Sequence, residues 1–470
     1  MTGLSARQRG VLLVGAAAYA LILFDQTATT TALSDIERDL GASVADLHWV
    51  FGAYLIGLAA LTPVAGRVAD LYGRRLLFVV GMAVFGIASL GCALAPSVEV
   101  LIGMRALQGV GGAFAMPLAL ANVSIVVPEE RRGWAVGVLV TGGSILLTSG
   151  PVIGGALVDL GGWRTVFGIA VPIVAVALLG VRRWMAETRE AEPPPLDVRG
   201  LVLLATGLGA LVTGLLQMSE WGADAPATLI ALAAGVVLLA GFVVVEHRIP
   251  NPLIALRLFT VPAVAGYLIA LLAAQFAVTA LTVELMLYLQ RSLGYGALAA
   301  GALFVPAVLG TPLLSPTTGR LEDRGLGRIL VTFGLGAAAV ALVWIAAFVG
   351  HDDAWILLPA LALFGLARPF VFTPASAGPL AALPPERHGL AGGLVLESYQ
   401  LGAVAGVAVA GVIVSSGEAG GDFDGAVQAA IAVAAGVSAV CAVAAWVLLG
   451  RDPARRPLRP DRRQDIAAPR

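Results

Sequence analysis

The chain has 470 residues, of which 59% are hydrophobic and 13% are charged, and its formal net charge is −1. Soluble domains carry about 25% charged residues, so this composition, with a mean hydropathy of +0.91, predicts an integral membrane protein without a sizeable soluble domain. All 29 basic residues are arginine, and the lack of lysine excludes a Walker-A site or a catalytic lysine, and therefore a self-contained ATP-driven pump.

Hydropathy along the chain predicts fourteen membrane-spanning helices that are separated by short polar segments. They are expected near residues 10–33, 47–66, 76–96, 98–122, 134–158, 163–183, 200–218, 227–245, 262–288, 297–316, 329–349, 354–376, 389–415 and 427–449. The first apolar stretch is too long for the core of a secretory signal peptide, so we expect it to be a retained span.

The distribution of arginine predicts the orientation of these spans. If the connection after each odd-numbered span lies outside, 24 arginines fall inside and only Arg38, Arg164 and Arg291 fall outside. Because basic residues are retained in the cytoplasm, both termini are expected there. The arginine-only composition, rich in alanine and glycine, suggests the inner membrane of a bacterial cell.

One short pattern occurs twice, eight spans apart. Gly66, Arg67 and Asp70 follow span two, and Gly319, Arg320 and Asp323 follow span ten with the same spacing. Two related six-span halves joined by an extra pair of helices explain this offset. The predicted organisation is an N-terminal six-helix bundle (1–183), a cytoplasmic linker (184–199), inserted helices seven and eight with the following cytoplasmic loop (200–261), a C-terminal six-helix bundle (262–450) and a disordered cytoplasmic tail (451–470).

These motifs resemble those of a known family. The run 66–75, Gly-Arg-Val-Ala-Asp-Leu-Tyr-Gly-Arg-Arg, resembles the signature between spans two and three of the major facilitator superfamily, and 101–113 is similar to its fourth-span motif. Gly150, Pro151, Gly154 and Gly155 are similar to its antiporter motif. The run Asp-Gln-Thr at 25–27 resembles the first-span signature of the fourteen-span drug:proton antiporters, and the pairs at 163–164 and 252–253 are also similar to that branch.

The resemblance implies an all-α integral membrane protein with the major facilitator fold, two six-helix bundles plus a two-helix insertion. It implies a proton-coupled secondary transporter that exports lipophilic drugs or antibiotics by alternating access. Lipophilic small molecules, protons and the lipid bilayer are the expected partners; no nucleic acid, cofactor or metal is expected, and we expect a monomer. The alternative is a proton symporter that imports a small metabolite. An enzyme is not expected, because no nucleophile, base or metal ligands cluster at one depth; the four histidines lack metal-ligand spacing.

Five charged residues fall inside predicted spans, where an ionised side chain costs about 2.5–3.5 kcal/mol. They are Asp25, Arg105, Glu284, Arg368 and Glu397. Asp25 and Arg105 are each expected about 10–12 Å below the outer surface. Burial favours a neutral carboxyl group and a nearby guanidinium favours a charged one, so we predict that Asp25 carries the coupling proton and Arg105 modulates it. The alternative is a static ion pair.

The other two acids have two interpretations each. Glu284 could bind a second proton or a cationic substrate, or be a solvated residue of an outer vestibule. Glu397 could bind a proton or substrate, or form a hydrogen bond to a neighbouring helix. Arg368 could face either acid.

Further candidates concern gating and the cavity. Asp70 and Arg74, with Gly66 and Gly73, are predicted to form a cytoplasmic gate latch, and Asp323 is a weaker copy in the second half; topology-determining charge is the alternative. The glycines of span five, with Pro151, are expected to let helices approach closely, as a generic packing motif also would. Aromatic and amide side chains are candidates for the substrate cavity, although aromatic residues near span ends are often interface anchors. They are Tyr19, Tyr54, Gln275, Tyr288 and Gln290.

Overall fold

The protein folds entirely into helices in the part of the chain that the structure describes. The structure is a computed structural model that describes residues 4–128, 131–189, 197–249, 256–383 and 388–450. Within these ranges fourteen helices are long and apolar enough to cross a membrane, as predicted. Part of the predicted linker (190–196), Pro252, Leu253 and the predicted disordered tail (451–470) lie outside the described residues.

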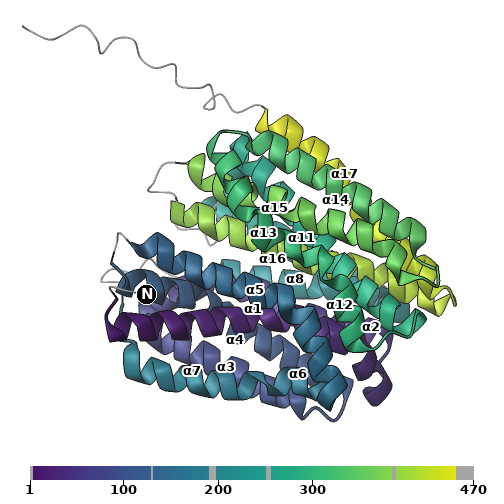
Figure 1. The fold of residues 1–470 in the computed structure, drawn as a ribbon, viewed down its shortest axis with the longest axis horizontal. Coiled ribbons are helices and arrows are strands. Elements are labelled where there is room, and N and C mark those ends of the chain that lie inside the picture. Colours follow the sequence, from purple (N-terminus) through teal and green to yellow (C-terminus); the bar gives the residue numbers. More distant parts are fainter. Residues whose placement is uncertain (1–3, 129–130, 190–196, 250–255, 384–387, 451–470) are drawn as a thin grey trace, which may run out of the picture.

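The first half of the chain forms six spans. In order, the elements are α1 (Ala6–Leu40), α2 (Val44–Tyr72), α3 (Arg74–Ala93), α4 (Val98–Val126), α5 (Arg132–Gly161), α6 (Arg164–Gly168) and α7 (Ala170–Trp184), of which α6 and α7 share one span. Figure 1 shows α1, α3, α4, α5 and α7 together in the lower half of the view.

The inserted pair and the second half follow. The elements are α8 (Val198–Leu216), α9 (Met218–Trp221), α10 (Pro226–Arg248), η2 (Leu256–Thr260), α11 (Pro262–Leu287), η3 (Tyr288–Ser292), α12 (Ala297–Phe304), α13 (Pro306–Asp323), α14 (Gly327–Phe348), η4 (Ala354–Leu357), α15 (Leu358–Ala381), α16 (His388–Ala419) and α17 (Phe423–Leu449). In Figure 1, α11, α13, α14, α15 and α17 lie in the upper half.

Local capping signals set the ends of α1. Ser5 begins the helix with a capping box, Gly41 ends it in the left-handed conformation (φ 65), and Ser43 begins α2 with a second capping box. At 1.5 Å per residue, the 35 residues of α1 extend over about 52 Å, well beyond a hydrocarbon core of about 30 Å. The helix therefore continues past the span that hydropathy predicts, which ends at residue 33.

The outer surface of the helices carries large apolar side chains. Ile87, Val176, Val237 and Val440 are 66–70% exposed and lie on helices from both halves and from the insertion. Exposed apolar side chains in such number are unfavourable in water and favourable against lipid acyl chains. The protein is therefore a multi-pass membrane protein, as the composition predicts.

The two bundles contact each other along several helix pairs. α5 packs against α12, α2 against α16, and α1 against α11. The inserted helix α8 packs on both α2 and α16, so it lies beside the contact between the bundles. The fold class predicted from the sequence is confirmed, while the residue limits of the bundles and of the linker stay a prediction.

Candidate functional site

The predicted pair Asp25 and Arg105 lies at the centre of a buried polar network. The Nη1 of Arg105 donates to Asp25 Oδ2 (2.6 Å) and to Gln108 Oε1 (2.5 Å). The Nε of Arg105 donates to the carbonyl of Val50 on α2 (3.0 Å). Gln108 Nε2 donates to Asp25 Oδ1 (3.0 Å) and to Ser89 Oγ on α3 (2.8 Å). The network therefore joins α1, α2, α3 and α4, and both oxygens of Asp25 accept hydrogen bonds, as a carboxylate does.

Small residues on α4 bring this network together. A Cβ added at Gly109 would lie 2.2 Å from the carbonyl oxygen of Tyr54, and one added at Gly111 would lie 2.5 Å from the backbone nitrogen of Phe85. Helices α2 and α3 therefore approach α4 more closely than side chains would allow. Tyr54 places its ring 4.4 Å from the guanidinium carbon of Arg105, which fills the space beside the ion pair.

The predicted pairing of Asp25 with Arg105 is present, and their contact places the two side chains at the same level of the bundle; their depth in the membrane stays a prediction. Asp25 lies fifteen residues before Leu40, the end of α1, which corresponds to about 22 Å. Arg105 lies only seven residues after Val98, the start of α4. The end of α1 therefore extends further past the level of this pair than the start of α4 does.

The side chain of Thr27 on α1 forms a hydrogen bond with α5 one turn before Pro151. Pro151 has no N–H group, so the carbonyl of Leu147, four residues earlier, loses its partner within the helix. The Oγ1 of Thr27 donates to this carbonyl oxygen (3.0 Å). A Cβ at Gly150 would lie 1.9 Å from the same hydroxyl, and one at Gly154 would lie 2.8 Å from the Cα of Ala28. The glycines of the motif thus allow the close approach of α1 and α5 that the sequence predicts.

The opposite face of the same motif contacts the second bundle. A Cβ at Gly155 would lie 2.4 Å from the carbonyl oxygen of Ala297 on α12, and one at Gly301 would lie 2.1 Å from that of Pro151. At this glycine seam, formed by Gly155, Ala297, Gly301 and Pro151, backbone meets backbone across the two bundles.

Glu284 is not a solvated vestibule residue, because its side chain is 0% exposed. Its Oε1 lies 2.7 Å from Nε2 of His48, which is also 0% exposed and belongs to the other bundle. Nearby, Arg291 forms ion pairs with Glu37 on α1 (3.5 Å) and with Glu418 on α16. Two polar contacts therefore join the bundles at the end where α1 terminates, which the arginine distribution predicts to be outside.

Two of the cavities between the bundles share Arg368 and Tyr399 in their lining. The larger, of about 90 Å³, is lined by α1, α4, α5, α13, α15 and α16 and includes Tyr19, Arg368 and Tyr399. The smaller, of about 30 Å³, includes Gln275 and again Arg368 and Tyr399. Glu397 lies on α16 between Leu396 and Tyr399, which line the larger cavity. It is 3% exposed, and among the described residues its carboxyl oxygens have no hydrogen-bond partner.

Three of the predicted cavity residues lie elsewhere. Tyr54 is fully buried against Arg105. The hydroxyl of Tyr288 donates to the carbonyl of His351 (3.0 Å) and accepts from the N–H of Gly350 (2.8 Å). Gln290 lines a separate cavity of about 940 Å³ at the end where α1 terminates. Only Tyr19 and Gln275 of the predicted set line the central cavities.

The predicted latch residues adjoin the turn between α2 and α3. Arg74 Nε donates to Asp70 Oδ1 (2.9 Å), and Gly73 supplies a φ of +118 that L-residues rarely adopt. The carboxylate of Glu187, which follows α7, accepts from the N–H of Arg75 (3.0 Å) and caps the start of α3. The segment after α7 therefore covers the first turn of α3.

The copy of this motif in the second half uses a different acid. Asp323 is exposed, whereas Glu322 is 8% exposed and accepts from the hydroxyl of Tyr267 (3.0 Å). Neighbouring residues on a helix point about 100° apart, so only one of the two acids faces the bundle. The buried acid of this copy is therefore Glu322, and the latch role expected of Asp323 stays a prediction. Gly66, in the first copy, has no atom within 4 Å of an added Cβ.

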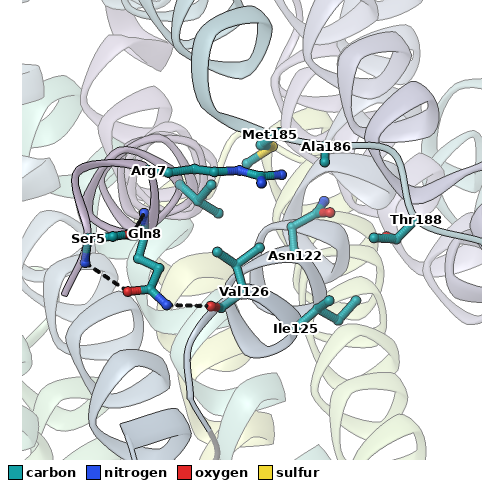
Figure 2. A pocket seen from close by; sticks show the side chains of 10 residues that line it. Ser5, Arg7, Gln8, Asn122, Ile125, Val126, Met185, Ala186 and Thr188 are labelled. Atoms are coloured by element: carbon teal, nitrogen blue, oxygen red, sulfur yellow. Dashed lines mark hydrogen bonds between the residues drawn. The ribbon is translucent and has the colours of Figure 1, made fainter.

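A further cavity of about 360 Å³ lies at the opposite end of the first bundle from Gln290 (Figure 2). It is lined by α1, α4 and the segment after α7. In Figure 2, Arg7 extends across it and Asn122 points into it. Gln8 Nε2 donates to the carbonyl of Val126 (3.1 Å) and fixes the start of α1 to the end of α4. None of the predicted site residues lines this cavity.

Comparison with known proteins identifies the family. The family model of the Major Facilitator Superfamily matches residues 15–396 and 268–469. The chain belongs to this superfamily.

Three relatives of this superfamily member are informative. The Multidrug resistance protein Stp of Mycobacterium tuberculosis (strain CDC 1551 / Oshkosh) is 31% identical and the alignment covers 84% of this chain and 74% of the relative. The Tetracenomycin C resistance and export protein of Streptomyces glaucescens is 33% identical, and the alignment covers 88% of this chain and 77% of the relative. The Puromycin resistance protein of Streptomyces alboniger is 33% identical, and the alignment covers 93% of this chain and 90% of the relative. The predicted superfamily is confirmed, and relatives named for resistance and export agree with the predicted class, a transporter rather than an enzyme.

Sequence analysis missed three residues at the sites of this major facilitator protein. His48 is an ionisable residue inside a span, and counting histidine together with the acids and arginines would have found it. Glu322 stands beside Asp323 in the repeated motif, and only the helical face distinguishes them. Glu187 lies in the predicted linker, where no local signal indicates that it caps α3.

Proposed function

We propose that this transporter exports lipophilic drugs or antibiotics across a bacterial inner membrane in exchange for protons, as a monomer with both termini in the cytoplasm. The resistance and export proteins among its relatives support the cargo class. The two bundles with cavities between them support alternating access, in which one bundle rocks against the other. The arginine distribution supports the orientation.

The network around Asp25 carries the proposal of proton coupling. The side chains of Asp25 and Arg105 are 3% and 0% exposed. They lie inside membrane spans, where ionised side chains are costly and mark functional sites. A proton on Asp25 removes its charge, weakens the contact with Arg105 and releases Gln108, which also holds Ser89 of α3. Proton binding at one carboxyl group therefore changes the contacts among four helices.

The same helix transmits this change to the contact between the bundles. Thr27, two residues after Asp25, holds the free carbonyl of Leu147 beside Pro151. Pro151 and Gly155 belong to the glycine seam with α12. A shift of α1 that follows protonation of Asp25 thus acts on α5 and on the seam.

In the proposed cycle, a proton from outside neutralises Asp25 and the outer ends close. The proton then leaves to the cytoplasm, and a drug that binds between the bundles leaves on the return stroke. The membrane potential contributes about 2.3 kcal/mol per charge per 100 mV to proton entry. We assign substrate contact to Tyr19, Gln275, Arg368 and Tyr399, and the cytoplasmic latch to Asp70 and Arg74.

The decisive experiment compares wild type with Asp25→Asn in cells that lack their own efflux pumps. Wild type is expected to raise resistance to ethidium or to antibiotics such as puromycin and tetracenomycin C, and Asp25→Asn is expected to abolish this gain. Asp352→Asn, an exposed aspartate between α14 and α15, is the matched control and should behave as wild type. Undiminished resistance with Asp25→Asn would overturn the proposal.

The direction of transport is tested in vesicles containing the purified protein and ethidium. An imposed pH gradient should move ethidium against the direction of proton flow. Movement with the proton flow would identify a symporter, and movement that persists after a protonophore collapses the gradient would exclude proton coupling.

A further inference from the structure

The contact between His48 and Glu284 joins the two bundles through one buried hydrogen bond of 2.7 Å. His48 lies on α2 five residues after the helix cap Ser43, which corresponds to about 7 Å. Glu284 lies on α11 seven residues before Arg291, which lines the cavity of about 940 Å³. The pair therefore lies within about two helical turns of the predicted outer end.

The partners of the imidazole determine how many protons the pair holds. Nδ1 of His48 lies 2.7 Å from the carbonyl oxygen of Val44. A carbonyl oxygen only accepts hydrogen bonds, so Nδ1 carries a hydrogen. The contact between Nε2 and Oε1 of Glu284 also requires one hydrogen, whether it belongs to the imidazole or to the carboxyl group. The pair thus holds one proton more than a neutral imidazole facing a carboxylate.

We propose that His48 and Glu284 form a proton-binding latch, in which a proton bound between them holds the outer ends of the bundles together and its loss to the outer side releases them. Without this proton, the lone pair of Nε2 faces a carboxylate oxygen, so two acceptors oppose each other. The carboxylate would also remain charged at a site that is 0% exposed, which is strongly unfavourable. Separation of the bundles relieves both effects because it admits water.

The rest of the carboxyl group points to the same conclusion. Among the described residues, Oε2 of Glu284 is buried and has no hydrogen-bond partner. A Cβ at Gly411 on α16 would lie 2.9 Å from Cγ of His48, so α16 covers the ring closely. While the bundles are together, the hydrogen bond to His48 is therefore the polar contact that offsets the cost of burying the carboxyl group of Glu284.

Few other charged groups face the pair. The inserted helix α8 contributes an apolar side chain, Leu216, beside Gly411. Glu418, two turns further along α16, acts electrostatically on His48, and it pairs with Arg291. Charged side chains at this end of the packed elements include Asp46 on α2, Asp35, Glu37 and Arg38 on α1, Arg291 after α11, Glu418 on α16 and Asp424 on α17. The ion pair between Arg291 and Glu37 offers a matched control, because it joins the bundles without a shared proton.

The sign of the pH dependence follows from the proton count. The closed form holds one proton more than the open form, so a rise in outside pH favours opening and a fall favours closing. For one proton, the ratio of open to closed molecules changes by up to about tenfold per pH unit. This inference rests on the proposed function and adds a second proton site to Asp25, because closure of the outer ends by an outside proton is the proton-driven step of the proposed cycle.

Distances between the outer ends test the latch directly. Spin labels are placed on cysteines at Leu94 and Trp355, which are 70% and 64% exposed on opposite bundles, after replacement of Cys92 and Cys441 by alanine. The protein is measured in lipid nanodiscs by pulsed electron resonance from about pH 5 to about pH 9, the range around the titration of histidine. The short distance should dominate at the acidic end, and a longer one should grow as the pH rises.

Variants separate the latch from other titrating groups. In Glu284→Gln the amide N–H donates to Nε2 of neutral His48, so the short distance should persist at every pH. Glu37→Gln removes one contact of Arg291 and should lengthen the distance at every pH while keeping the wild-type slope. The double variant H48L/E284L carries no titratable group at the latch and should lose the part of the slope that the latch contributes; it keeps the test valid if a single variant fails to fold.

Ethidium efflux driven by a pH gradient is measured on the same samples. A slope that Glu284→Gln abolishes supports the latch even if wild type shows no gradient-driven efflux, a result that would refute the proposed function alone. A wild-type distance that does not change with pH, or an unchanged slope in Glu284→Gln or H48L/E284L, overturns the latch even if efflux is intact.

Discussion

Replacing Asp25 by asparagine separates a structural ion pair from a proton carrier. The substitution removes the charge that Arg105 contacts at 2.6 Å and places an amide donor beside a guanidinium donor. Removing one partner of a buried ion pair costs about 3–5 kcal/mol. Arg105 keeps its bonds to Val50 and Gln108, so we expect Asp25→Asn to lower the free energy of unfolding by about 3 kcal/mol, at the lower end of that range.

The double variant Asp25→Asn/Arg105→Met completes the comparison. Because no charge remains buried, its free energy of unfolding should return to within about 1 kcal/mol of wild type. Stability is measured by denaturant unfolding in detergent micelles, and transport by ethidium efflux under a pH gradient. We expect both variants to be inactive. Recovery of gradient-driven efflux in the double variant would show that the pair is only structural support, and this would refute the assignment of the coupling proton to Asp25.

Other predictions concern single positions. Gly155→Ala should lower efflux about tenfold, because the added Cβ would lie 2.4 Å from the backbone oxygen of Ala297 across the seam. Gly137→Ala lies on the same helix with open space around the added Cβ and should transport normally. Equal efflux by the two variants would contradict the role of the seam. Glu187→Ala should lower the free energy of unfolding by about 1 kcal/mol through loss of a cap, seen as a lower thermal midpoint. No change is expected in Asp352→Ala, at an exposed position between α14 and α15. Glu397→Gln should reduce efflux of cationic ethidium and spare uncharged chloramphenicol, and equal loss of both would argue against a substrate contact.

The sequence predicts the spans and the central ion pair because simple physical limits apply to both. A span needs about 20 apolar residues, and a charge in the bilayer needs a partner, so Asp25 and Arg105 can be matched from their positions along the chain. The predicted first span ends at residue 33, seven residues before the end of α1, because capping by Ser5, Gly41 and Ser43 determines where a helix ends, and hydropathy does not report it.

Contacts between the bundles could not be predicted in this way. His48 and Glu284 are 236 residues apart, and their meeting depends on how two separately folded halves pack. Choosing Glu322 over Asp323 requires the helical face to within one residue, which the repeated motif does not resolve. The prediction that Tyr54 lines a cavity is wrong because it packs on Arg105, and an aromatic side chain in a span gives no sign of which neighbour it covers.

The glycine seam also bears on how such a transporter can diversify. A larger residue at Gly155 or Gly301 would displace the backbone of the helix that faces it. Natural substitutions at these positions are therefore expected to be rare and to inactivate the transporter. Side chains such as Thr311, Phe372 and Leu396 line the larger central cavity on α13, α15 and α16 without that constraint. Laboratory selection for a new resistance spectrum should therefore yield substitutions on the C-terminal half, while the seam stays unchanged.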